Sequence, residues 1–314
     1  MRSVPQPLQG ASTKAPPHVF LILATLFWAG NFVFGRELAA ALPAVGINLI
    51  RWLLACAVLV PLSLVLEGPA ALKPLRANPR LWAMLAVMSA SGVLAFNSLV
   101  YLALTETTST SAALINATTP ILTLFIAALI GGAVGTGGGE LTLRRLAGAL
   151  LGVAGVAWIV SRGSPAALAE LSLNRGDALM LVAALAWALY TVVSGGVARQ
   201  MSPLSAVTVS ALMALPVLAA IGGPGLANSG AAFTPLVVSG LIYVGLFASV
   251  AAYLSWNTGI GRLGASRGAI FLNLIPVFTA LLAFVVLDER LEPSQIAGGA
   301  LVLLGVTLVN TGKG

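Results

Sequence analysis

Polar side chains are scarce in the long apolar runs of this sequence, and those that occur there are its best candidates for chemistry. Arg51 is the one charged residue well inside such a run, about eight residues after Pro43. At 1.5 Å per helical residue it lies roughly 12 Å from the start of its helix, where a guanidinium could bind a carboxylate. The alternative is a structural cation that bonds helix-end carbonyls or reaches toward a polar interface.

Four asparagines lie in the same runs: Asn31, Asn97, Asn116 and Asn273. An amide both donates and accepts hydrogen bonds, so it can serve the ammonium and the carboxylate of a zwitterion. The alternative is hydrogen bonding between helices, worth about 0.6 to 2 kcal/mol for each residue.

Aromatic residues supply bulky apolar surface in these runs. The candidates to line a cavity are Trp28, Tyr101, Trp187, Tyr190 and Tyr253. Trp187 and Tyr190 are three residues apart and therefore share one helix face. A cavity lined by such rings suits a bulky, mostly apolar substrate, and core packing is the alternative. Trp52, Trp82 and Trp158 lie near the ends of runs and are expected to be interface anchors.

Residues for metal binding or covalent catalysis are almost missing. The chain has one histidine, His18, and one cysteine, Cys56, so we expect no disulfide, no metal site and no cofactor. The nine acids all lie at the ends of apolar runs or between them, which disfavours a proton relay through a buried carboxylate. An integral membrane enzyme would need a cluster of His, Asp or Ser at the membrane surface, and none is present.

Ten apolar runs of about 20 residues position these candidates. Of the 314 residues, 59% are hydrophobic and only 8% are charged, which excludes a water-soluble fold. The run cores are 18–35, 43–66, 81–104, 109–133, 146–161, 178–198, 203–221, 235–257, 264–287 and 294–311. We therefore expect an all-α polytopic membrane protein with ten transmembrane helices.

The ten runs form two copies of five. Pro120 meets Pro276 at an offset of 156, and Trp28 and Tyr101 match Trp187 and Tyr253 at offsets of 159 and 152. Because five is odd, the second copy must be inverted relative to the first, as in carriers that work by alternating access around a central cavity. We expect a disordered cytoplasmic tail at 1–17, one repeat at 18–161, a connecting loop at 162–177 and the inverted repeat at 178–314.

Pro120 and Pro276 occupy matching positions inside the fourth and ninth runs. A proline cannot bond the carbonyl four residues earlier and bends its helix. Two bends in inverted positions could act as hinges, one at each mouth of the cavity. The alternative is a pair of static kinks.

Lys and Arg set the expected orientation. Alternate connections carry eleven on one side and four on the other, so both termini should be cytoplasmic. We expect a multi-pass protein of a cell membrane of the bacterial inner-membrane type. Its expected partners are the lipid bilayer and a small-molecule substrate, with no nucleic acid, and the chain is expected to be a monomer.

Several segments resemble the EamA-type drug/metabolite transporter superfamily: FWAGNFVFGR from Phe27, the pair Arg51-Trp52, SAALINATTPILT from Ser111 and DERLEPSQIAGGALVLLGVTL from Asp288. The resemblance covers nearly the whole chain and is greatest to YddG-type exporters of aromatic amino acids. It implies ten helices, a cavity that opens alternately to either side, and export of small metabolites.

Together, these observations favour an alternating-access carrier that exports amino acids, preferably aromatic ones, by facilitated diffusion or exchange. The same scaffold could instead carry drugs or other metabolites. Nucleotide sugars rank last, because phosphorylated cargo would call for several cations in the cavity.

Overall fold

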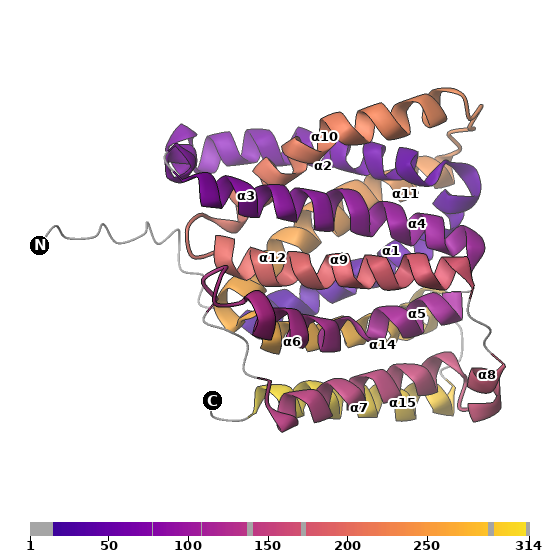
Figure 1. Ribbon diagram of the computed structural model, residues 1–314. Coiled ribbons are helices and arrows are strands. Elements are labelled where there is room, and N and C mark those ends of the chain that lie inside the picture. The colour runs from indigo at the N-terminus through magenta and orange to yellow at the C-terminus, as the bar shows by residue number, and fades with distance from the viewer. Residues whose placement is uncertain are drawn as a thin grey trace, which may run out of the picture.

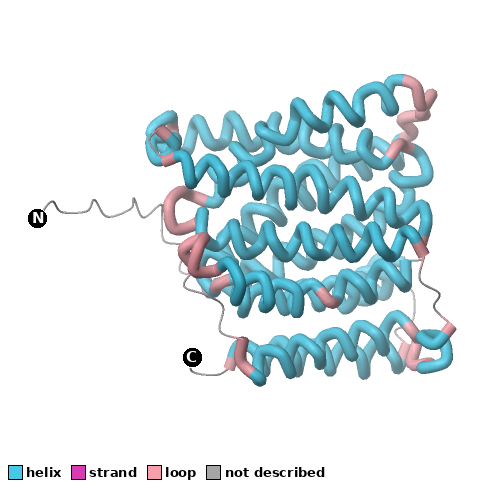
Figure 2. The backbone as a smooth tube through the Cα atoms, in the orientation of Figure 1, coloured by secondary structure: helices cyan, strands magenta, loops and turns pink. Residues whose placement is uncertain are grey.

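The computed structural model describes residues 15–76, 78–107, 109–136, 141–170, 174–287 and 292–311. Within these ranges every regular element is helical and there is no strand (Figures 1 and 2). Nine helical stretches of the described residues are long and apolar enough to cross a membrane, and the 25-residue helix α1 (Pro17–Ala41) occupies the place of the first expected span. The expected all-α polytopic membrane fold is confirmed.

The five spans of the first half include two that are interrupted. They are α1; α2 (Ala44–Leu66); α3 (Pro79–Met88) with the π-helix η2 (Ser89–Phe96) and α4 (Asn97–Glu106); α5 (Ser109–Ala117) with α6 (Thr119–Ile130); and α7 (Leu143–Val160). The short 3₁₀ helix η1 (Pro69–Leu75) connects α2 to α3.

The second half repeats this order. Its spans are α9 (Arg175–Val197); α10 (Pro203–Ala227); α11 (Pro235–Gly245) with the π-helix η3 (Leu246–Ala251) and α12 (Ala252–Leu263); α13 (Ala265–Gly268) with the 3₁₀ helix η4 (Ala269–Asn273) and α14 (Leu274–Leu287); and α15 (Pro293–Asn310). In both halves, the third span contains a π-helix and the fourth is broken.

The connection between the halves differs from the expected loop at 162–177. It contains the short helix α8 (Pro165–Ala169), and α9 begins at Arg175. The start of α9 is fixed by a capping box, in which the Asp177 backbone N–H donates to Asn174 Oδ1 and the Asn174 N–H donates to Asp177 Oδ2, each at 3.0 Å. Such reciprocal bonds satisfy two N–H groups that a helix start leaves without intrahelical partners.

Helices α7 and α15 lie side by side at one edge of the bundle (Figure 1). Their glycines meet in two reciprocal contacts, because a Cβ on Gly155 would lie 2.6 Å from the Gly298 carbonyl oxygen and one on Gly305 would lie 2.5 Å from that of Gly148. Gly148 corresponds to Gly298, and Gly155 to Gly305, in the sequence repeat. Each contact therefore maps onto the other when the halves are exchanged, as an inverted repeat requires.

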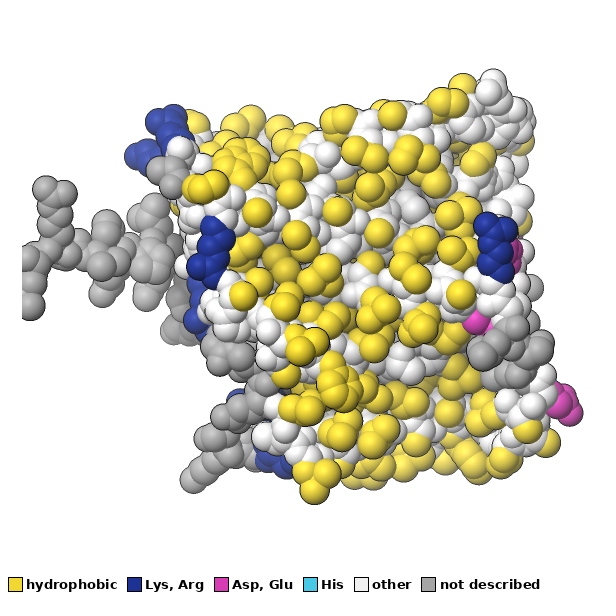
Figure 3. Space-filling view, viewed as in Figure 1, with side chains coloured by type: hydrophobic (Ala, Val, Ile, Leu, Met, Phe, Trp, Pro, Cys, Tyr) yellow, Lys and Arg dark blue, Asp and Glu magenta, His cyan; other side chains and the backbone are white. Residues whose placement is uncertain are grey.

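The sides of the bundle suit lipid. Hydrophobic side chains cover most of the face in Figure 3, and Lys and Arg gather at its left edge, with others at its right edge beside acidic groups. Leu64, Val65, Leu129 and Leu143 are each more than half exposed. A bilayer core removes such surface from water, so this exposure is expected of a membrane protein.

Candidate functional site

A pocket between the two halves brings together most of the predicted polar and aromatic residues. The empty space between its atoms, including space open to solvent, is about 490 Å³. Its walls come from α1, α2, η2, α4, α5, α9, η4 and α14, with lining residues Trp28, Asn31, Arg51, Phe96, Asn97, Val100, Tyr101, Asn116, Trp187, Leu272 and Ile275.

The guanidinium of Arg51 is hydrogen-bonded through two of its nitrogens, and the third has no described partner. The residue is 1% exposed; its Nε donates to Ser249 Oγ at 2.8 Å, and its Nη1 donates to Asn97 Oδ1 at 2.9 Å and to Tyr101 Oη at 3.3 Å. Its other terminal nitrogen, Nη2, has no hydrogen bond to any described residue. The partners of Arg51 are thus side chains of other spans rather than helix-end carbonyls, and the guanidinium is oriented with donors left for the pocket.

The residues that hold Arg51 are themselves fixed by backbone carbonyls. Asn97 Nδ2 donates to the Gly92 carbonyl at 3.0 Å and to Tyr253 Oη at 3.0 Å, and Tyr253 Oη donates to the same Gly92 carbonyl at 2.8 Å. Ser249 Oγ donates to the Val244 carbonyl at 2.8 Å. Tyr253 therefore does not line the pocket but supports it, by orienting Asn97.

The aromatic part of the pocket is a packed cluster of rings. Trp187 lies edge-on to Trp28, with ring centroids 5.1 Å apart, and at 4.7 Å from Phe96. Tyr190 stacks against Trp187 from outside the pocket at 4.8 Å, and its hydroxyl accepts a hydrogen bond from Asn257 at 2.6 Å. The indole N–H of Trp28 donates to the Ala248 carbonyl at 3.0 Å. The rings at the pocket surface are thus held in place by residues that lie outside the pocket.

The predicted asparagines have different positions. Asn31 and Asn116 line the pocket, and Asn116 Oδ1 has no hydrogen-bond partner among the described residues. Asn273 is fully buried in η4 but does not line the pocket. It packs against α7 instead, since a Cβ on Gly152 would lie 2.2 Å from Asn273 Nδ2.

Both predicted prolines follow a break in their span. α5 ends at Ala117, just before Pro120, and the Asn116 carbonyl, which Pro120 cannot bond, accepts from the Thr119 hydroxyl at 2.6 Å. Pro276 lies near the start of α14, directly after the 3₁₀ helix η4. Both irregular segments border the pocket, because Asn116 precedes the first break and Leu272 lies in η4.

Trp52 is not at an interface, contrary to the expectation from sequence. It is fully buried and packs edge-on against Tyr253 with centroids 4.9 Å apart. Trp82 and Trp158 are 44% and 39% exposed and lie at the surface of the bundle. Ser249 is the main residue that sequence reasoning missed. Its signal was available, since residue 249 corresponds to residue 97 at the offset of 152 that relates Tyr101 to Tyr253.

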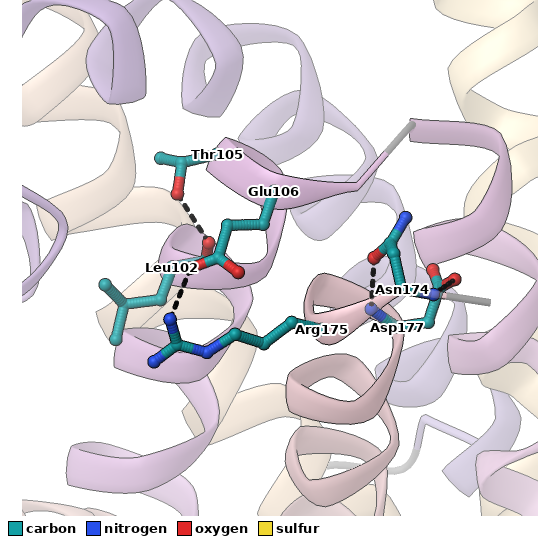
Figure 4. Close-up of polar contacts among 6 residues, drawn as sticks. All are labelled: Leu102, Thr105, Glu106, Asn174, Arg175 and Asp177. Carbon is teal, nitrogen blue, oxygen red and sulfur yellow. Dashed lines mark hydrogen bonds and ion pairs between the residues drawn. The ribbon is translucent and has the colours of Figure 1, made fainter.

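A polar cluster joins the two halves at one end of the bundle, away from the pocket lining. Thr107 Oγ1 donates to Asp177 Oδ1 at 2.5 Å, and Arg175 forms an ion pair with Glu106 at 3.8 Å. Figure 4 shows Arg175 reaching from the first turn of α9 to the last turn of α4. Gly176 allows this contact, because a Cβ there would lie 2.7 Å from the Thr107 backbone nitrogen. These contacts hold the last turn of α4 against the first turn of α9.

Comparison with known proteins gives consistent matches. The sequence pattern of the EamA-like transporter family matches residues 16–161 and again 174–311. An uncharacterized transporter of Archaeoglobus fulgidus is 31% identical over 93% of this chain and 96% of its own length. The uncharacterized transporter YyaM of Bacillus subtilis is 30% identical over 82% of this chain and 81% of its own.

Two more distant proteins match nearly the whole chain. A probable terminal-alkyne amino-acid exporter of Streptantibioticus cattleyicolor is 25% identical over 92% of both chains. A solved crystal structure of a protein superposes with a TM-score of 0.71, at 18% identity, over 94% of this chain and 96% of that chain. At that identity, the second match supports the fold alone.

Proposed function

The chain belongs to the EamA-like transporter family, and from this premise we propose that it is an alternating-access carrier that exports amino acids, preferably with aromatic or bulky apolar side chains. The observation that carries the proposal is the geometry of Arg51. Its guanidinium is held by neutral side chains on one side, lines the pocket and keeps Nη2 without a described partner. Such a group is prepared to bind a carboxylate.

The rest of the pocket fits the remaining parts of an aromatic amino acid. Trp28, Phe96 and Trp187 offer apolar ring surface, and aromatic rings attract one another in edge-on and offset arrangements. Asn116 Oδ1, which lacks a partner among the described residues, can accept from the substrate ammonium. A carboxylate at Arg51 would therefore leave the side chain of the substrate among the rings.

Transport by facilitated diffusion or exchange is the mode that the charges favour. The described acids are Glu37, Glu67, Glu106, Glu170, Asp177 and Glu292, and each lies at or near a helix end or in a connection. A proton relay in a pump uses carboxylates in the membrane interior. We therefore propose that the substrate gradient, rather than a proton gradient, supplies the driving force.

The pseudo-symmetry of the bundle suits alternating access. Inverted repeats allow one structure to open toward either side by exchanging the conformations of its halves. The broken spans at Pro120 and Pro276 border the pocket and are the proposed hinges. From the distribution of Lys and Arg, we propose that both termini are cytoplasmic and that the protein lies in a cell membrane of the bacterial inner-membrane type.

The name of the Streptantibioticus cattleyicolor relative, an amino-acid exporter, supports amino acids as the substrate class. The second candidate is a carrier of drugs or other metabolites on the same scaffold, favoured by the large apolar share of the pocket lining. Arg51 separates the two, because neutral or cationic drugs have no carboxylate to pair with its guanidinium.

Counterflow in proteoliposomes tests the proposal. Vesicles loaded with unlabelled phenylalanine are diluted into labelled phenylalanine, with equal pH on both sides. A carrier gives a transient accumulation of label, which is driven by the unlabelled substrate inside the vesicles. Empty vesicles do not show this accumulation. Simple equilibration without trans-stimulation would indicate a pore, and no uptake of any amino acid would refute the proposal.

A further inference from the structure

The geometry points to a broader substrate class than amino acids: the pocket takes amphipathic monocarboxylates whether or not they carry an amino group. This inference rests on the proposed function, because it assigns the substrate carboxylate to Arg51.

Arg51 has no counter-charge among the residues that the structure describes. Its described partners, Ser249, Asn97 and Tyr101, are all neutral. No described carboxylate forms an ion pair with it; Glu67 accepts hydrogen bonds from Ser202 and Ser205, and Glu106 pairs with Arg175. A buried cation without a counter-charge is costly. An anionic ligand would provide the missing partner and form a charge-assisted hydrogen bond.

An ammonium finds no equivalent partner among the described residues of the pocket. The described polar groups of the pocket besides Arg51 are amides, a phenol and two indole N–H groups, and the acceptor without a hydrogen-bond partner among them is the neutral oxygen of Asn116. An ammonium entering the pocket loses water, gains only neutral acceptors and is repelled by the guanidinium. The amino group of an amino acid therefore adds little to affinity, whereas the carboxylate is essential.

A series of phenyl compounds tests this on the intact protein. Phenylalanine, 3-phenylpropionate and 2-phenylethylamine share a phenyl ring on a two-carbon chain. Phenylalanine carries both charged groups, 3-phenylpropionate carries the carboxylate alone, and 2-phenylethylamine carries the amine alone. Binding to purified protein in nanodiscs is followed by quenching of the tryptophan fluorescence and by the shift in unfolding temperature. Equilibrium binding avoids errors from undissociated acid that crosses vesicle membranes unaided.

We expect 3-phenylpropionate to bind at least as tightly as phenylalanine, and 2-phenylethylamine to bind at least about tenfold more weakly than either. Arg51→Gln should abolish this preference. Arg175→Gln makes the same change at a position that is 82% exposed and should retain it. The comparison of the three compounds on the unmodified chain stands even if Arg51→Gln does not fold.

The results separate this inference from the proposed function. If phenylalanine binds and 3-phenylpropionate does not, the proposed function stands and the inference is overturned. Equal binding of 2-phenylethylamine and 3-phenylpropionate also overturns it. If none of the three binds, the proposed function fails, and the inference fails with it.

Discussion

Asn97 and Ser249 occupy corresponding positions in the two halves of the bundle, and both accept a hydrogen bond from the guanidinium of Arg51, at 2.9 and 2.8 Å. Each also donates to the carbonyl five residues earlier, Asn97 to Gly92 and Ser249 to Val244. These carbonyls lie within or just before the π-helices η2 and η3, elements that are frequent at functional sites. The guanidinium of Arg51 thus forms hydrogen bonds with corresponding positions in both repeats.

Ser249→Ala should weaken substrate binding. The substitution leaves Arg51 Nε without its partner, and hydrogen bonds to charged groups are worth about 1.5 to 3 kcal/mol. We expect the dissociation constant for phenylalanine to rise about tenfold, measured by tryptophan fluorescence. Ser239→Ala is the matched control, because that exposed hydroxyl bonds only the Leu236 carbonyl of its own helix. Equal affinities in the two variants would show that Ser249 does not contribute to substrate binding.

Asn116→Leu should slightly lower the affinity for phenylalanine without lowering stability. Its Oδ1 has no described partner in the folded chain, and replacing an unsatisfied buried polar group by an apolar one of similar size is neutral or stabilising. We expect an unfolding temperature at or above that of the unmodified chain, a small loss of affinity for phenylalanine and an unchanged affinity for 3-phenylpropionate.

Asn310→Leu near the end of α15 is the control for this change, and it should leave binding of both compounds as it was. A loss of thermal stability in Asn116→Leu, with unchanged binding of phenylalanine, would show that Asn116 contributes to packing rather than to the substrate site.

Pro120→Ala and Pro276→Ala should shift the carrier toward opposite states. Each restores a backbone N–H that can bond the carbonyl four residues earlier, and so favours a straight span in one half only. Single cysteines in each half of the cavity, in a Cys56→Ser background, report accessibility from the two sides. Identical accessibility in both variants and in the parent, with unchanged transport rates, would mean that the prolines only shape the bundle.

Gly155→Leu should destabilise the protein strongly. Its Cβ would lie 2.6 Å from the Gly298 carbonyl oxygen, so α7 and α15 must separate, and overpacking commonly costs about 1 to 3 kcal/mol or more. Gly132→Leu provides the control, because a Cβ there meets no atom within 4 Å. The unfolding temperature in detergent is the measurement. A stable Gly155→Leu variant would contradict the close reciprocal contact of the two helices.

Much of the fold could be predicted because a membrane restricts the choices. Apolar run length locates a helix, and the matched Pro120 and Pro276 reveal the repeat against a background rich in Ala, Leu and Gly. The π-helices were not predictable, because they depend on contacts between spans, such as the hydroxyl of Tyr253 on the carbonyl of Gly92.

Site residues could be predicted where the side chain is rare in lipid. Arg51 and Asn97 are conspicuous for that reason, and they do meet in the pocket. Ser249 is not conspicuous, because a serine can satisfy its hydroxyl on its own helix. Asn273 does not line the pocket and Trp52 is not at an interface, because the rotation of their helices turns Asn273 toward α7 and places Trp52 against Tyr253. The type of a single residue does not reveal this rotation.

A structure of the protein with bound phenylalanine tests the central claim most directly. We expect the phenyl ring to lie among Trp28, Phe96 and Trp187, and a carboxylate oxygen to lie about 2.7 to 2.9 Å from Nη2 of Arg51, the spacing of charge-assisted hydrogen bonds. Phenylalanine bound outside this pocket, or with its carboxylate turned away from Arg51, would contradict the account.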